Sequence, residues 1–205
     1  DRYIYIKATK IESSFFEVIL IDFNESLKIE FKNDPKKIAP SDYFRAGLYV
    51  LEKNGIIPNQ GYQIQINGDL PINAGLSSSS SLVVGWIKFL VKAFAVRRKI
   101  DNLQIAKWAV ETEVDFFNQA GGIMDQYTIS IGGLMMIDTS KKTYEKLEGS
   151  LGPLLVIDSG ESKNTQGVLS NAKVNAQEAI KHVKKSNKDF DLTCLLYTSP
   201  SPRDR

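Results

Sequence analysis

Hydrophobic and polar residues alternate through much of the first third of the chain, and this period of two predicts β-strands. Lys28, Glu30 and Lys32 occupy the positions between one set of apolar residues, which indicates a strand with one face toward water. The alternating apolar sets are Tyr3 and Tyr5; Phe16, Val18 and Leu20; Leu27, Ile29 and Phe31; and Tyr62, Ile64 and Ile66.

Four segments have patterns typical of helices. Residues 42–53 show helical spacing, with Ser41 as the predicted N-cap, and residues 82–96 are apolar on nearly all sides, as in a buried helix. Asp101 is predicted to cap a helix over residues 103–117, and residues 165–185 form a polar helical pattern.

The second half of the chain carries two further predicted strands. Residues 129–138 include the apolar run 134–137, and residues 154–158 are predicted to form a short buried strand. Because strands and helices do not alternate regularly as βαβ units, the pattern favours an α+β fold over a doubly wound sheet.

Composition excludes some classes of function. The 205 residues include 26 Lys and Arg against 24 Asp and Glu, so charge gives no reason to expect nucleic acid as a partner. The longest apolar stretch, residues 82–96, is interrupted by Lys88 and Lys92 and is too short for a membrane span. The single cysteine, Cys194, favours a reducing compartment, and we expect a cytoplasmic protein.

The segment from Pro71 to Ser81 combines features of a phosphate-binding loop. A strand ends before it, Gly75 permits a positive φ, and five serines then open the buried helix. Free backbone N–H groups and the positive end of the helix dipole attract phosphate there, and serine hydroxyls can add donors or ligate Mg²⁺. From the residues alone, a low-complexity serine linker remains the alternative.

Two motifs in this order resemble the GHMP kinases. The first is Pro71-x-x-x-Gly75-Leu-Ser-Ser-Ser79, and the second is Gly122-Ile-Met-Asp-Gln126. Together they look most like galactokinases and related sugar kinases. The resemblance covers about residues 3–185 and implies the family's N-terminal domain, of the ribosomal protein S5 domain 2-like fold. The first of these motifs is a different phosphate-binding loop from the Walker A motif, which this sequence lacks.

The resemblance also implies roles for individual residues. Asp125 matches the catalytic aspartate that accepts or orients the proton of the sugar hydroxyl. Glu113 matches the acidic Mg²⁺ ligand, paired with Ser79 or its neighbour Ser78. The residues implied to bind the phosphates of ATP are Gly75, Leu76, Ser77, Ser78, Ser79, Ser80 and Ser81. Gly122 and Asp158, with Asp125, are the expected substrate contacts, although Asp158 departs from the family pattern and a turn or cap is its alternative role.

These roles imply ATP-dependent phosphorylation of a sugar hydroxyl, with galactose to galactose 1-phosphate as the first choice. A kinase for another sugar or a uronic acid is an alternative, and a non-catalytic regulator that senses sugar and ATP is another. The expected partners are a small-molecule sugar and ATP with Mg²⁺, and neither nucleic acid nor a membrane. The sequence does not indicate an oligomeric state.

The predicted domains are an ATP-binding domain over residues 1–152, the beginning of a C-terminal domain over 153–192, and a non-native tail over 193–205. The tail resembles read-through of a sequencing adapter. The chain begins within a predicted strand, so we interpret both ends as truncated. Since the family's N-terminal sugar-binding motif and its C-terminal domain are missing, we expect the fragment itself to be inactive.

Overall fold

The computed structural model describes residues 2–71, 74–95, 97–157, 165–188 and 190. The chain divides into two compact units, residues 1–163 and 164–205, and each is considered by itself. The predicted domain limits at residues 152 and 192 remain predictions. No helix among the described residues is long and apolar enough to cross a bilayer.

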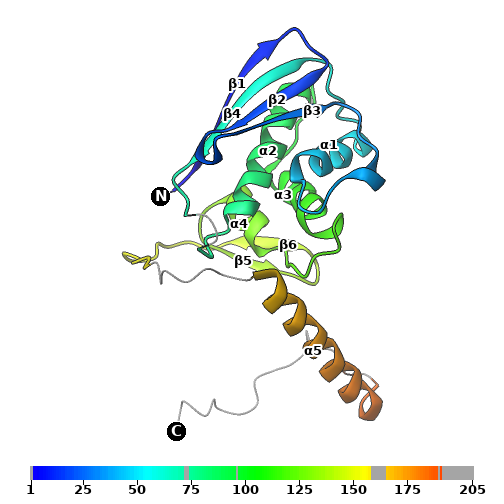
Figure 1. The fold of residues 1–205 in the computed structure, drawn as a ribbon. Coiled ribbons are helices and arrows are strands. Elements are labelled where there is room, and N and C mark those ends of the chain that lie inside the picture. The colour runs from blue at the N-terminus through cyan, green and yellow to red at the C-terminus, as the bar shows by residue number, and fades with distance from the viewer. Residues whose placement is uncertain (1, 72–73, 96, 158–164, 189, 191–205) are drawn as a thin grey trace. The chain divides into compact units, whose positions relative to one another are not determined.

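A four-stranded sheet forms one layer of the first unit (Figure 1). Its strands are β1 (Ile4–Ile11), β2 (Phe15–Leu20), β3 (Glu25–Glu30) and β4 (Gly61–Gly68), in the order β1-β4-β2-β3. The β1–β4 and β2–β3 pairs are antiparallel, whereas β2 and β4 run parallel. The mixture of strand directions with separate helices confirms the predicted α+β class.

The strand register explains the alternation of polar and apolar residues. Val18 lies opposite Ile64, and both side chains are fully buried. On the other face, Gln63 Nε2 donates to Glu17 Oε2 at 2.8 Å. One face of the sheet therefore packs on the core and the other is polar, as the sequence predicted.

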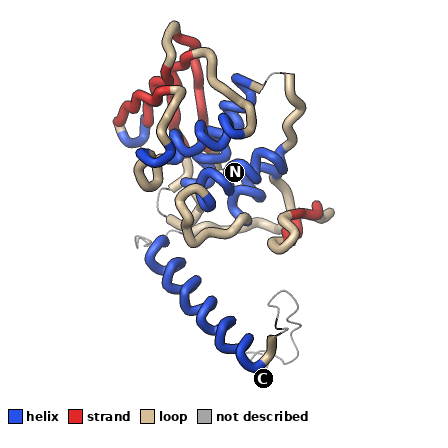
Figure 2. The backbone as a smooth tube through the Cα atoms, turned by 90° about the vertical axis from the view of Figure 1, so that its right-hand side faces the viewer, coloured by secondary structure: helices blue, strands red, loops and turns tan. Residues whose placement is uncertain are grey.

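Helices cover the apolar face of this sheet, as Figures 1 and 2 show from two directions. They are α1 (Tyr43–Lys53), α2 (Ser78–Phe94), α3 (Asn102–Val110) and α4 (Met124–Ile131). Between α3 and α4 lies a π-helical segment, Glu111–Asp115, and short 3-10 turns occupy Ile21–Phe23 and Pro35–Lys37. Helix α2 contacts α1, α3 and α4, so it lies at the centre of the helical layer.

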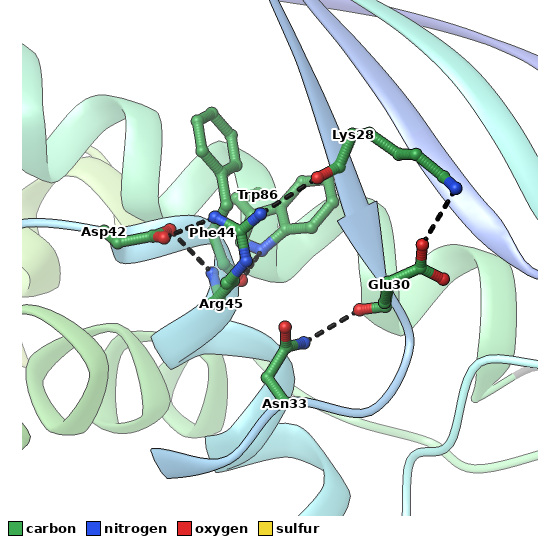
Figure 3. Close-up of polar contacts among 7 residues, drawn as sticks. All are labelled: Lys28, Glu30, Asn33, Asp42, Phe44, Arg45 and Trp86. Carbon is green, nitrogen blue, oxygen red and sulfur yellow. Dashed lines mark hydrogen bonds and ion pairs between the residues drawn. The ribbon is translucent and has the colours of Figure 1, made fainter. Parts of the chain in front are cut away.

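Trp86 joins α2 to α1 in the core. Its indole Nε1 donates to the Phe44 carbonyl oxygen at 3.0 Å, and its ring meets the Phe44 ring edge-on at 5.2 Å (Figure 3). Gly47 permits this approach, because a Cβ there would lie 2.8 Å from the indole Cδ1. The two helices consequently pack at close range around one buried aromatic side chain.

Helix α1 is capped by Asp42, and the prediction of Ser41 as its N-cap is wrong. The Asp42 carboxylate accepts from the Arg45 backbone N–H at 3.1 Å and from Arg45 Nη1 at 2.6 Å. Arg45 Nη2 also donates to the Lys28 carbonyl oxygen at 2.9 Å, which ties the helix to β3 (Figure 3). Ser41 has a φ of 64° and lies in the turn before the cap.

The apolar run over residues 134–137 is confirmed as a strand to within one residue at each end, whereas residues 129–131 of the same segment belong to a helix. Helix α4 runs on to Ile131, and Gly132 follows with a φ of 72°. Tyr127 and Ser130 are buried at helical spacing, and this inward face explains why the helix persists there. Only β5 (Met135–Asp138) is a strand, and it pairs with β6 (Thr143–Lys146) in a separate antiparallel hairpin.

Residues 154–157 form neither a strand nor a buried segment, so this part of the predicted strand is wrong; its last residue, Asp158, lies outside the described residues. The exposed fractions of Leu154, Leu155, Val156 and Ile157 are 77%, 83%, 63% and 78%. A strand needs a neighbour for its backbone groups, and no described strand pairs with this segment.

In the second unit, the predicted helix is confirmed as α5 (Thr165–Ser186). The predicted non-native tail lies outside the described residues.

Candidate active site

The first turn of α2 begins from two residues with positive φ. Gly75 has a φ of 80° and Ser77, the N-cap, has a φ of 54°. The Ser77 side chain makes no capping hydrogen bond, so the cap leaves the amides of this turn free to bind a ligand. Ser79 is exposed, Ser80 is buried, and Ser77, Ser78 and Ser81 are half-buried. The segment therefore presents both N–H and hydroxyl donors, as the sequence predicted, although residues 72–73 lie outside the described residues.

Glu113 lies in the π-helical segment that follows α3. The predicted single helix over residues 103–117 is therefore corrected: its α-helical part ends at Val110, and Asp101 caps it by accepting from the Gln104 N–H at 2.8 Å. The wider π-helical turn accompanies burial of both Thr112 and Glu113. Such segments often occur at functional sites.

The Glu113 carboxylate is buried without a described cationic partner. Its residue is only 6% exposed, and none of the ion pairs among the described residues includes it. Its neighbour Glu111 instead pairs with Lys53 at 3.4 Å near the surface. A buried carboxylate without a cation is costly, so a cation from outside the chain fits this position.

Asp125 lies in the first turn of α4, where the helix dipole favours a negative charge. Its side chain is half-buried. No described residue makes a hydrogen bond or an ion pair with its carboxylate. The connection that follows the π-helical segment ends at Ile123, because α4 begins at Met124. Gly122 is exposed just before this helix, whereas Asp158 lies outside the described residues.

Gln126 connects three segments that are far apart in the sequence. Its Nε2 donates to Glu113 Oε2 at 2.7 Å and lies 3.4 Å from Ser80 Oγ. The contact therefore joins the first turn of α2, the π-helical segment and the first turn of α4. Sequence reasoning assigned no role to Gln126, although its position beside Asp125 in the second motif was a signal.

The donor set suits magnesium bound together with phosphate. Among the described residues, no group of three or more His, Cys, Asp or Glu side chains could hold a metal by itself. Mg²⁺ is usually bound by one or two carboxylates, waters and substrate phosphates, and Glu113 with a serine hydroxyl matches that need. The structure connects Glu113 to Ser80 through Gln126, and the pairing of Glu113 with Ser79 remains a prediction.

A cavity borders α3, the π-helical segment and α4. It is lined by Lys107, Glu111, Asp115 and Lys142, together with apolar residues and Tyr127. Neither Glu113, Asp125 nor any of the five serines contributes to its wall, so the cavity gives no support to the sequence-predicted site.

Asp138 forms the turn after β5, where its Oδ1 accepts from the backbone N–H groups of Ser140 and Lys141, each at 3.0 Å, and from Ser140 Oγ at 2.7 Å. Hydrogen bonds lower the pKa of Asp138 to about 2. The bond from the Lys141 N–H has the largest effect, and the bond from the Ser140 hydroxyl has the next largest. Since the folded pKa lies below the unfolded one, this contribution to stability is present above about pH 4 and is lost as pH falls through 2.

We therefore expect NMR titration to find the Asp138 carboxyl midpoint near pH 2, and Ser140→Ala to raise it. Thr139→Ala, in the same turn, is the control and should leave it unchanged. A midpoint near 4 in the unmodified chain would contradict the turn geometry.

Comparison with known proteins identifies the domain. Residues 42–133 match the family model for the GHMP kinases N terminal domain. The galactokinase of Limosilactobacillus reuteri (strain DSM 20016) is 30% identical over 182 residues, which cover 87% of this chain and 45% of that protein. The galactokinase of Pyrococcus furiosus is 32% identical over 148 residues, or 71% of this chain and 41% of that protein.

The fold agrees with these matches. The crystal structure of Lactococcus lactis galactokinase complexed with galactose superposes with a TM-score of 0.73 at 20% identity, covering 93% of this chain and 50% of that one. The chain spans less than half the length of the two curated relatives above. We conclude that residues 42–133 match the N-terminal domain of the GHMP kinases, and that the relatives and the fold agree with this match.

Proposed function

We propose that the protein containing this chain uses ATP and Mg²⁺ to phosphorylate a sugar hydroxyl, with galactose to galactose 1-phosphate as the first choice. The observation that carries the proposal is the convergence of the serine turn, Glu113 and the second motif through Gln126. The galactokinases among the relatives support a sugar as the acceptor.

The proposed chemistry needs positioning and charge neutralisation more than covalent catalysis. Asp125 accepts or orients the proton of the attacking hydroxyl, and no described residue competes for its carboxylate. The backbone N–H groups that the first turn of α2 leaves unpaired, together with the hydroxyls of residues 75–81, hold the phosphates; the Ser81 N–H is excepted, because it donates to the Ser77 carbonyl oxygen at 2.9 Å. Glu113 and Ser79 would hold Mg²⁺, which when bound neutralises charge on the β- and γ-phosphates. Gly122 and Asp158 are the further proposed substrate contacts.

A coupled assay of ADP release across a panel of sugars and uronic acids, on the full reading frame, tests this function. We expect ADP release that depends on one sugar, and the panel distinguishes galactose from the alternatives. Binding of sugar and ATP without ADP release would instead favour the non-catalytic regulator. The presence of Asp125, Glu113 and the serines favours the enzyme.

Glu113→Gln should separate metal binding from folding. The variant keeps an acceptor for Gln126 but removes the buried charge, so the metal-free chain should be as stable as the parent or more stable. Its affinity for Mg²⁺ in the presence of ATP should fall at least about tenfold, since even second-shell changes have effects of that size. Thermal unfolding with and without Mg²⁺ and ATP measures both effects.

Glu111→Gln is the matched control for this experiment, because Glu111 is in the same segment but pairs with Lys53. It should leave the metal affinity unchanged. If Glu113→Gln and Glu111→Gln gave the same metal affinity as the parent, Glu113 would not be the ligand.

A further inference from the structure

Gln126 is a buried amide side chain whose oxygen has no hydrogen-bond partner among the described residues. The residue is 3% exposed, yet its Oε1 is buried and has no hydrogen-bond partner among the described residues. Its Nε2, in contrast, contacts both Glu113 Oε2 and Ser80 Oγ. Buried polar atoms are nearly always paired, so an unpaired acceptor beside a buried carboxylate calls for an explanation.

The orientation of the Gln126 amide follows from the chemistry of its neighbour. Glu113 Oε2 accepts at 2.7 Å, and only the NH₂ group of the amide can donate to it. Turning the amide over would place Oε1 against the carboxylate oxygen, which is repulsive. The unpaired oxygen therefore points away from Glu113 Oε2 and is buried without a donor among the described residues.

We propose that Gln126 is a positioning residue for the metal site, an inference that rests on the proposed function. Its N–H group holds one oxygen of Glu113, which fixes the carboxylate and directs the other oxygen to the cation. Its free Oε1 accepts from a water of the hydrated cation, since Mg²⁺ retains several waters when protein-bound. Hydrogen-bonded partners of this kind orient metal ligands and tune their affinity.

The position of Gln126 also links the metal site to the proposed catalytic group. It directly follows Asp125 in the first turn of α4, so both side chains depend on the placement of the same helix end. The contact to Ser80 holds that end beside the first turn of α2. A single amide thus aligns the carboxylate ligand with the two helix N-termini that form the rest of the site.

The test is the affinity for Mn²⁺ in the presence of ATP, measured by electron paramagnetic resonance of free Mn²⁺ on the 205-residue chain. Gln126→Met keeps the volume and removes both hydrogen-bonding groups, and it should lower the Mn²⁺ affinity about 10–100-fold. Its affinity for ATP without metal should stay within about twofold of the parent, because the serine turn remains intact. A purely structural role would instead lower metal-free ATP binding and the melting temperature together.

Ser130→Ala is the matched control. Ser130 lies on the same helix with the same 3% exposure, and its Oγ donates to the Asn102 carbonyl oxygen at 2.8 Å. This variant loses a buried hydrogen bond and should keep the parent Mn²⁺ affinity. Gln126→Asn serves as a second test if Gln126→Met does not fold, because it retains an amide but withdraws it by one methylene; it should also lose Mn²⁺ affinity.

The outcomes separate this proposal from the function on which it rests. If Glu113→Gln loses Mn²⁺ affinity while folded Gln126→Met or Gln126→Asn matches Ser130→Ala, the positioning role of Gln126 is overturned and the metal site stands. If the parent takes up no Mn²⁺ with ATP, or Glu113→Gln binds it as well as the parent, the proposed metal site fails and this inference fails with it.

Discussion

Replacement of Asp125 by alanine in the full reading frame is expected to lower sugar-dependent turnover by about 10²–10⁴-fold. Asp125 is half-buried at the start of α4, and no described residue bonds to its carboxylate. Its removal therefore takes away a reactive group without breaking a hydrogen bond or ion pair of that carboxylate among the described residues. The proposed phosphate site is the separate turn at α2, so ATP affinity should remain close to that of the parent.

Steady-state kinetics and ATP titration of the same preparations measure the two effects. Asp115→Ala is the control, because Asp115 is an exposed aspartate in the neighbouring π-helical segment and should not alter turnover. Near-normal turnover in Asp125→Ala would remove the catalytic assignment. Equal losses of turnover in both variants would point to a general disturbance of the segment between α3 and α4.

Trp86→Ala is expected to have the largest effect on stability, lowering the free energy of unfolding by about 3–5 kcal/mol. Trp86 is 1% exposed and contacts the rings of Phe16, Phe44 and Phe89. Truncation leaves a large cavity where α2 meets α1 and the sheet, and it removes the hydrogen bond to the Phe44 carbonyl oxygen. Because domains of this size are stable by about 5–15 kcal/mol, this loss is a large fraction of the total.

Urea denaturation of Trp86→Ala and Trp86→Phe measures this loss and divides it into parts. The Phe variant keeps an aromatic ring and loses the N–H donor, so the hydrogen-bond part of its cost should be about 1 kcal/mol. A loss below about 1 kcal/mol for Trp86→Ala would contradict the packing of α2 against α1.

The elements that could be predicted from the sequence are those whose alternation of apolar and polar residues reflects which face packs against the core. The strand pairs around Val18 and Ile64, and the nearly all-apolar helix α2, are confirmed because periodicity reports directly on which face meets the core. The cap at Asp101 is confirmed because it depends on one local hydrogen bond.

Features that depend on tertiary contacts could not be read from the pattern. A π-helical turn differs from an α-helical turn by only one residue, so the apolar spacing around Glu113 also fits an α-helix. The sequence therefore predicted one continuous helix. Residues 154–157 have the composition of a buried strand, but a strand also requires a neighbour, which periodicity does not reveal. Gln126 was missed because its significance lies in a contact with Glu113, 13 residues away.

Phosphorus NMR of a reaction containing the full-length protein, MgATP and a sugar tests the central claim most directly. The account predicts that a sugar phosphate monoester signal grows in step with ADP, and that neither grows with Asp125→Ala at the same ATP occupancy. Formation of ADP with inorganic phosphate alone, or the same monoester signal from Asp125→Ala, would contradict it.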